Sequence, residues 1–181
     1  MGLHVKKKCG FTIVELVMAM AIMGIAVSVA IPGFSRWLPD YRLKSAATDL
    51  YTNLQLTKMY AIRDSTDWSL SFSTTFDAYV FKKGGVQQTQ PAVVLLSRYK
   101  GGVDFGYGNA TDSIPSSGSP PAAVVTFPYH DPYYEVTFNS RGLADSEGYV
   151  YLQNSKNATY AVGSLTTGFI LMRKWTGTAW E

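Results

Sequence analysis

Charge is nearly absent from one long stretch of this chain. From Phe11 to Ile31 the sequence has 21 residues without Lys, Arg, Asp, His, Asn or Gln, and Glu15 carries the only charge. A helix of this length spans about 31 Å, close to the roughly 30 Å of a bilayer's hydrocarbon core. The scarcity of charge therefore predicts a segment that inserts into a membrane.

Cysteine and histidine are also scarce. The only cysteine is Cys9, which excludes an intrachain disulfide, and His130 is the one histidine beyond residue 10. Catalysis requires a convergent set of activated groups, and the sequence has no Gly-x-Ser-x-Gly elbow and too few zinc ligands. We therefore expect neither an enzyme nor a bound metal or cofactor. Calcium at Asp145 and Glu147 stays an alternative, although two acids beside a glycine usually form a solvated turn.

The single acid of the apolar stretch is its most unusual feature. A carboxylate near the centre of a membrane helix is unfavourable by about 2.5–3.5 kcal/mol on insertion scales, and by less near the helix end. Cleavage of the chain after Gly10 would free the amine of Phe11, four residues before Glu15 and one helical turn away. A cut at this junction would thus create the cation that the segment itself lacks.

Three lysines, Lys6, Lys7 and Lys8, precede the apolar segment. By the positive-inside rule they hold this end in the cytoplasm and send the rest of the chain across the membrane. Residues 1–10 contain these three of the 16 Lys and Arg and none of the 13 Asp and Glu, so 13 bases face 13 acids in the remainder. This balance gives no general argument for nucleic-acid binding.

The order of these features resembles the class III leader of type IV pilins and pseudopilins. A short basic leader ends at Gly10, Phe11 follows, and Glu15, Gly24 and Pro32 occur at the expected places. The resemblance implies that a prepilin peptidase cuts between Gly10 and Phe11 and methylates the new N-terminus. It also implies that Glu15 pairs with the terminal amine of a neighbouring pilin or pseudopilin during fibre assembly.

Two other interpretations of this segment stay open. One is an ordinary secretory signal peptide, because Ser28, Val29 and Ala30 are small residues at the spacing that signal peptidase prefers. The other is a plain anchor on an unrelated periplasmic domain. The apolar length, the acid at Glu15 and a helical pattern that continues past Ala30 favour the pilin-type leader over both.

The remainder of the chain predicts an α+β fold, with a long N-terminal helix packed on an antiparallel β-sheet domain. Pro32 and Pro39 should interrupt or kink this helix, which then resumes and ends near Arg63. The domains expected are a leader (1–10), a transmembrane helix (11–31), its amphipathic continuation (32–63) and a periplasmic β-rich domain (64–181). The apolar residues expected on one face of the continuation are Leu43, Ala47, Leu50, Leu54 and Ala61.

Short β-rich runs separated by Gly, Asn, Asp, Ser and Pro fill the C-terminal domain. The links are too short for helical crossovers, so an antiparallel sheet is expected, with a loop over residues 106–121. The predicted strands are Trp68–Ser73, Ala78–Lys82, Val93–Tyr99, Ala123–Phe127, Tyr134–Asn139, Tyr149–Gln153, Thr159–Gly163 and Phe169–Lys174.

The soluble part has a second resemblance, to the GspH/FimT group of minor pseudopilins. It is carried by the helix from Leu50 to Arg63 with the strand that follows, by Asn139–Gly142, and by a last strand after Gly168. The resemblance implies a minor subunit of a type II secretion pseudopilus. The alternative within the group is a minor pilin that primes type IV pilus assembly or binds DNA.

Basic and aromatic residues come together near the end of the chain, where Arg173 and Lys174 precede Trp175. Pilus members of this group that bind DNA typically do so through a Gly-Arg-x-Arg pattern, which this chain does not reproduce because Phe169 follows Gly168. A DNA contact at these three residues stays an alternative. The neutral charge favours a terminal strand with solvated basic tips and a tryptophan that covers the edge of the core.

Overall fold

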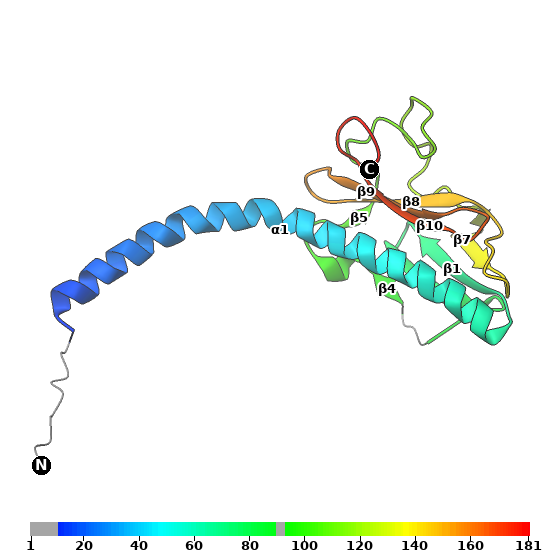
Figure 1. Ribbon diagram of the computed structural model, residues 1–181, viewed down its shortest axis with the longest axis horizontal. Helices are drawn as coiled ribbons and strands as arrows, with labels where there is room; N and C mark the ends of the chain where they lie inside the picture. Colours follow the sequence, from blue (N-terminus) through cyan, green and yellow to red (C-terminus); the bar gives the residue numbers. More distant parts are fainter. Residues whose placement is uncertain (1–10, 90–92) are drawn as a thin grey trace, which may run out of the picture. The chain divides into compact units, whose positions relative to one another are not determined.

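The computed structural model describes residues 11–89 and 93–181, apart from the side chains of residues 29, 30 and 32–36. Within this part, one α-helix, α1 (Ile13–Asp64), precedes ten short strands (Figure 1). The chain divides into two compact units, an N-terminal unit that ends at Trp37 and a globular unit that comprises Leu38–Glu181. The second part of α1, residues 38–64, therefore belongs to the globular unit.

The helix differs from the sequence prediction in its continuity. We expected Pro32 and Pro39 to interrupt or kink it; the interruption is not found, because α1 is helical through both positions and ends at Asp64, one residue after the predicted end. A proline removes one backbone donor, and the neighbouring turns keep theirs. The predicted apolar face is confirmed, because its five residues are all 0% exposed: Leu43, Ala47, Leu50, Leu54 and Ala61.

The strands form two antiparallel sheets rather than one. Sheet A has the order β3-β2-β1-β7-β6, with β4 paired to β2, and sheet B has the order β10-β9-β8-β5. Sheet A consists of β1 (Trp68–Ser73), β2 (Ala78–Lys83), β3 (Val86–Gln87), β4 (Val94–Leu95), β6 (Tyr129–His130) and β7 (Tyr133–Phe138). Sheet B consists of β5 (Asp104–Phe105), β8 (Gly148–Gln153), β9 (Thr159–Ser164) and β10 (Ile170–Lys174).

Six of the eight predicted strands are confirmed to within a residue or two, and two predictions are wrong. The run Val93–Tyr99 forms only the short β4 and then a 3-10 helix, Leu96–Tyr99, whose first residue is buried. The run Ala123–Phe127 makes a single bridge, Val125 to Val150, and no strand. Apolar runs of this length indicate burial but do not distinguish a strand from another buried conformation.

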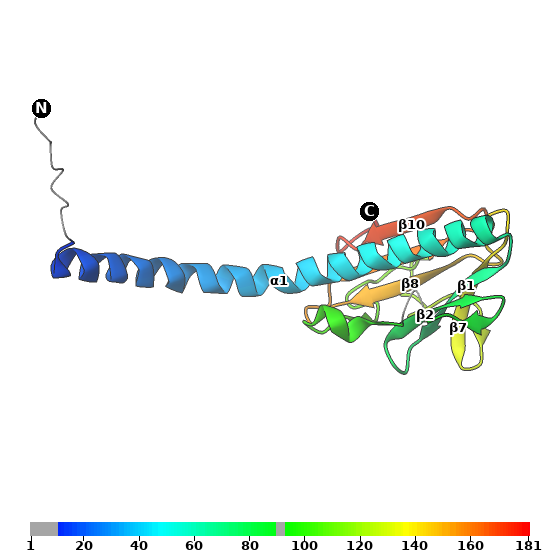
Figure 2. The ribbon, with the colours of Figure 1, turned by 90° about the horizontal axis from the view of Figure 1, so that it is seen from below.

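One hydrophobic core joins α1 to the inner faces of both sheets. The buried face of the helix packs with Leu70, Phe72 and Val136 of sheet A and with Val150 and Leu152 of sheet B. Figures 1 and 2 show residues 38–64 of α1 lying along the strands on this side. The opposite face of sheet B carries a second, smaller cluster, composed of Tyr149, Tyr151 and Ala161 with Trp180, Leu171, Ile114 and Tyr107 packed against it.

Polar contacts hold residues 38–64 of α1 against the sheets at several levels. Near the start of this part, the Asn154 amide donates to Asp40 over 2.8 Å, and near its end Lys58 Nζ donates to the Gly168 carbonyl over 2.9 Å. In between, Asn53 donates to the hydroxyl of Tyr79, whose pKa burial raises to about 12. Residues 38–64 are thus fixed to the two sheets by polar contacts as well as by their apolar face.

Candidate assembly segment and clefts of the globular unit

Thr12 begins the helix next to the predicted cleavage junction. Its hydroxyl accepts a hydrogen bond from the Glu15 backbone N–H over 3.3 Å, and its carbonyl accepts one from the Leu16 N–H over 3.1 Å. Thr12 is therefore the N-cap, and Glu15 occupies the third helical position, where the helix dipole favours a negative charge. Sequence reasoning missed this role, although Thr-x-x-Glu is the capping-box pattern.

The N-terminal unit exposes apolar side chains on all sides of the helix. Burial of such surface is worth about 25 cal/mol per Å² of apolar area, so the segment gains free energy only by contact with lipid or protein. Within the described part of the chain, no helix is both long enough and apolar enough to qualify as a membrane span. Between residues 11 and 31, the large apolar side chains with an exposed fraction of 52–82% are Phe11, Ile13, Val14, Leu16, Val17, Met18, Met20, Ile22, Met23, Ile25, Val27 and Ile31.

The predicted processing and assembly residues are described only in part. Gly10 and the lysines Lys6, Lys7 and Lys8 lie outside the described residues. Phe11 lies just before the helix and is exposed, and Glu15 is exposed in the first turn. The described part of the junction is thus accessible and carries an acid amid apolar surface.

The basic residues near the end of the chain are close together, but the tryptophan beside them is buried. Trp175 is 7% exposed, and its ring centroid lies 5.2 Å from that of Trp180. Arg173 is half-buried and donates to the Trp180 carbonyl over 3.3 Å, whereas Lys174 is exposed. The indole of Trp175 therefore packs within the fold, and only the basic side chains face solvent.

The residues weighed for metal binding lie on exposed turns. Asp145 accepts hydrogen bonds from the Thr137 N–H over 2.9 Å and from the Ser146 hydroxyl over 3.1 Å. His130 is exposed at the end of β6, before a turn. Among the residues that the structure describes, no three His, Cys, Asp or Glu side chains come together as a potential metal site.

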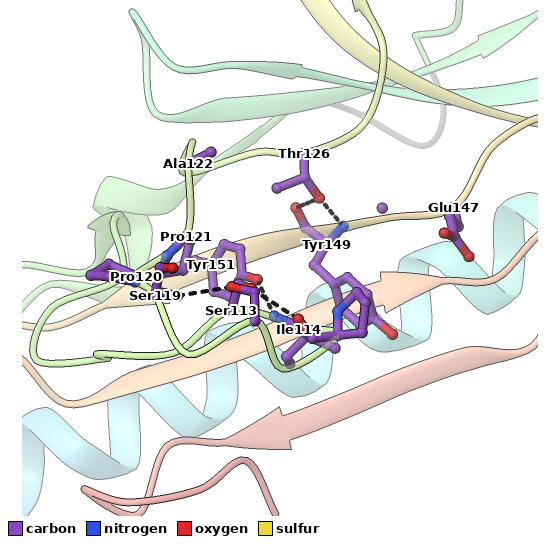
Figure 3. A pocket seen from close by; sticks show the side chains of 13 residues that line it. Ser113, Ile114, Ser119, Pro120, Pro121, Ala122, Thr126, Glu147, Tyr149 and Tyr151 are labelled. Atoms are coloured by element: carbon purple, nitrogen blue, oxygen red, sulfur yellow. Dashed lines mark hydrogen bonds between the residues drawn. The ribbon is translucent and has the colours of Figure 1, made fainter.

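Two adjoining clefts lie on the outer face of sheet B, on either side of Ser113–Pro115. One, of about 450 Å³, lies between the loop that ends at Ala122 and the start of β8 (Figure 3). The other, of about 530 Å³, reaches the C-terminal residues around Trp180. Ser113, Ile114, Pro115 and Tyr149 line both clefts.

Comparisons with known proteins place this geometry in a class. A family profile described as the prokaryotic N-terminal methylation motif matches residues 5–31. Together with the pilin-like arrangement of one long helix on antiparallel sheets, this match defines a type IV pilin-like subunit. A second profile, described as Type II transport protein GspH, matches residues 46–168, more than half of the chain. The chain therefore belongs to the GspH family.

Two solved structures are similar to parts of this chain, and the first of them shows a likeness in fold. The minor pseudopilin EpsH from the type 2 secretion system of Vibrio cholerae is 13% identical, with a TM-score of 0.50 over 72% of this chain and 95% of that one. The type IV minor pilin FimU of Pseudomonas aeruginosa is 14% identical, with a TM-score of 0.43 over 78% of this chain and 94% of that one. A comparison with curated protein sequences gave no significant match.

Family membership has direct consequences for the chain. It makes this protein a pilin-like minor pseudopilin that is anchored through its N-terminal segment and assembles with other pilin-like subunits. The methylation motif implies processing by a prepilin peptidase. The match over residues 46–168 also excludes the alternative of an unrelated domain on a plain anchor.

Proposed function

We propose that this chain is a minor pseudopilin of a type II secretion pseudopilus and serves assembly rather than catalysis. The observation that carries the proposal is the apolar surface of residues 11–28, which is exposed around the whole helix and contains a single acid, Glu15. Such a surface suits a helix that passes from lipid into a bundle of like helices. The family description, a type II transport protein, favours secretion over a pilus.

Processing prepares the helix for this transfer. A prepilin peptidase cuts between Gly10 and Phe11 and methylates the amine of Phe11. Thr12 is the N-cap, so Phe11, the residue after the bond to be cut, lies outside the regular helix. The leader lysines keep this end in the cytoplasm, so the globular unit lies in the periplasm.

A membrane stage precedes assembly in this proposal. It rests on the full sequence of residues 11–31, including residues 29 and 30, whose side chains lie outside the described set. Residues 11–31 hold the subunit in the inner membrane as a single span, and later pack in the fibre core. Burial of the apolar surface supplies the free energy of assembly, and the pair between Glu15 and a neighbour's Phe11 amine sets the register.

The second candidate, a minor pilin that primes type IV pili or binds DNA, has less support. Stacking of bases requires an exposed aromatic face, and Trp175 is buried. Arg173 and Lys174 alone give a small basic patch on a chain whose mature charge balances. Cross-linking of the assembled subunit in its host separates the two candidates, since a secretion pseudopilin joins secretion pseudopilins and a minor pilin joins pilins.

The first test is the N-terminal mass of the chain after co-expression with a prepilin peptidase. A mature chain that starts at methylated Phe11 is expected, and Gly10→Ala should leave the precursor uncut. A start near residue 31, or an intact Met1, contradicts the proposed junction.

The second test concerns register. Glu15→Ala should insert and be processed normally but fail to join the pseudopilus, whereas Thr12→Ser, which keeps the capping hydroxyl, should assemble. Wild-type incorporation of the Glu15→Ala chain, measured by cross-linking to partner pseudopilins, contradicts the role of this acid.

A further inference from the structure

Three segments of the globular unit meet where α1 enters it. The Asn154 amide donates to Asp40 over 2.8 Å, which joins the turn after β8 to the helix. A Cβ added to Gly101 would lie 3.3 Å from the Arg42 side chain, and the Gly101 carbonyl accepts a hydrogen bond from the Ser155 N–H over 3.5 Å. The surface that these contacts define, called the entry surface below, comprises residues 39–44, 100–102 and 154–156.

The entry surface concentrates positive charge. Residues 38–181 as a whole contain 12 Lys and Arg and 12 Asp and Glu. The entry surface has four of these bases and a single acid, Asp40, which is already bonded to Asn154. The remainder of the globular unit therefore has eight bases and 11 acids, so the unit is polarised although its total charge balances. The four bases are the half-buried Arg42 and the exposed Lys44, Lys100 and Lys156.

Lys100 occupies a backbone conformation that favours glycine. Its φ is 57° and its ψ is −178°, and its N–H closes the 3-10 helix by donating to the Ser97 carbonyl over 3.1 Å. Gly101 and Gly102, which follow, also have positive φ values, of 70° and 68°. A side chain at such a position strains the backbone, and strain of this kind gathers at functional sites. The lysine at this position thus indicates that its charge is needed there.

The chain also limits how far the entry surface can be from the apolar segment. Pro39, where the surface begins, follows Ile31 by eight residues. Even a fully extended chain of eight residues spans at most about 29 Å. Whatever the angle between the two units, the entry surface therefore stays near any membrane that holds residues 11–31. Such a short tether gives even a weak surface contact a high effective concentration.

We infer that the entry surface docks on anionic phospholipid headgroups while residues 11–31 occupy the membrane. Lysines are point charges on flexible stems, which suit a layer of headgroups better than one shaped ligand. An acidic protein surface would favour the planar fork of arginine, and only one of the four bases is an arginine. Tyr41, which is 55% exposed, adds the kind of aromatic side chain enriched at membrane interfaces.

This inference rests on the membrane stage of the proposed function and adds a lipid contact to it. The contact holds the globular unit at the bilayer before assembly and breaks when the subunit passes into the fibre.

The direct test places the processed full-length chain in nanodiscs that contain a lipid with a spin-labelled headgroup. One set of discs consists of phosphatidylcholine, and the other also contains phosphatidylglycerol. The amide NMR signals of Gly102 and Ser155 should broaden more in the anionic discs, and about 1 M salt should abolish the difference. Gly142, which lies beside Ile62 toward the other end of this part of α1, should not broaden. Equal broadening in both sets of discs overturns the inference.

Variants separate the charge of the entry surface from its packing. Lys100→Gly removes one charge together with the backbone strain, so it should weaken docking about fivefold without lowering the urea concentration at which the unit unfolds. Lys156→Gln should weaken docking by a similar factor. The matched control is Arg141→Gln, an exposed base outside the entry surface, which should dock normally. Unchanged docking in both lysine variants overturns the inference, and a native NMR spectrum excludes misfolding as the cause of a loss.

The same samples distinguish a failure of this inference from a failure of the proposed function. A processed chain that enters neither kind of disc contradicts the membrane stage, and the inference with it. A chain that enters the discs but does not respond to phosphatidylglycerol overturns the inference alone. If Lys100→Gly then lowers cross-linking to partner pseudopilins in the host, the entry surface binds an acidic protein and the lipid partner is wrong.

Discussion

Both parts of α1 contain large apolar residues, but these side chains are exposed in the first part and largely buried in the second. Ile22 and Ile25 in the N-terminal unit are more than 60% exposed, whereas Leu50 and Leu54 in the globular unit are fully buried. Apolar residues surround the helix in the first part and occupy one face in the second. The backbone of α1 is one continuous helix, but its two parts differ in the distribution of apolar residues around the axis. This distribution shows that the two parts are suited to different surroundings.

Truncation of a buried and of an exposed residue of the same helix should separate the two parts most strongly. Leu54→Ala removes methyl groups from a fully buried site and should lower the free energy of unfolding by about 2–5 kcal/mol. Ile22→Ala should change it by less than about 0.5 kcal/mol. Urea unfolding of the full chain, followed by tryptophan fluorescence, measures both. Equal losses would mean that the first part also packs within its own chain.

Glycine gives the next contrast, because the same substitution meets different surroundings. Gly168 has a φ of +74°, and an added Cβ would overlap the Gly142 carbonyl, whereas nothing lies within 4 Å of a Cβ at Gly24. Gly168→Ala should destabilise the globular unit by about 2–4 kcal/mol through backbone strain and overpacking. Gly24→Ala should leave its unfolding unchanged. A stable Gly168→Ala variant in the same urea experiment would contradict the described turn.

Removal of one polar anchor should have a smaller effect. Lys58→Met keeps the apolar stem but loses the bond to the Gly168 carbonyl, and should lower stability by about 1–3 kcal/mol. The matched control is Lys44→Met, because Lys44 is exposed on the same helix. If both variants unfold at the same urea concentration, the Lys58 contact contributes nothing to the attachment of the helix.

The smallest expected effect is a dependence of stability on pH. Burial by itself raises the pKa of Glu135, but hydrogen bonds from Lys82, Ser69 and Ser71 outweigh it, so the pKa lies below its usual value. A lowered folded-state pKa stabilises the fold above the unfolded value of about 4.3, and this contribution is lost as pH falls through the folded pKa. Urea unfolding between pH 7 and 3 should show this loss, and Glu135→Gln should reduce it. An unchanged slope in the variant would assign the acid sensitivity to other carboxylates.

Periodicity and strand propensity predicted most of the fold. The face of α1 that contains Leu43 and Ala61 followed directly from the spacing of apolar residues, because burial imposes the helical period on the sequence. The division into two sheets was not predictable, since it depends on which strands pair over long distances. The predicted strand Val93–Tyr99 was wrong for a related reason. Leu96 is buried in a 3-10 helix, and a short apolar run looks the same in the sequence whether it is buried as a strand or as such a turn.

Some candidate sites could likewise be predicted from the sequence, and others could not. The junction at Gly10, Phe11 and Glu15 is a local sequence pattern and could be proposed without any structure. The clefts on sheet B could not, because Glu147 and Arg173 are brought to one face only by the pairing of β8, β9 and β10. The capping role of Thr12 was available from the sequence and was missed because Glu15 was considered only as a partner for a charge.

The attachment of α1 to the sheets also bears on mechanical load. In a subunit pulled by its N-terminal segment, tension enters the globular unit at residue 38. The contacts at Asp40, Asn53 and Lys58 and the apolar face between them follow one another along residues 38–64, so a pull parallel to this part of the helix would shear them together instead of peeling them one by one. Resistance to forced unfolding depends on the unfolding rate rather than on equilibrium stability. This arrangement therefore suits a subunit that is extracted from one environment and driven into another.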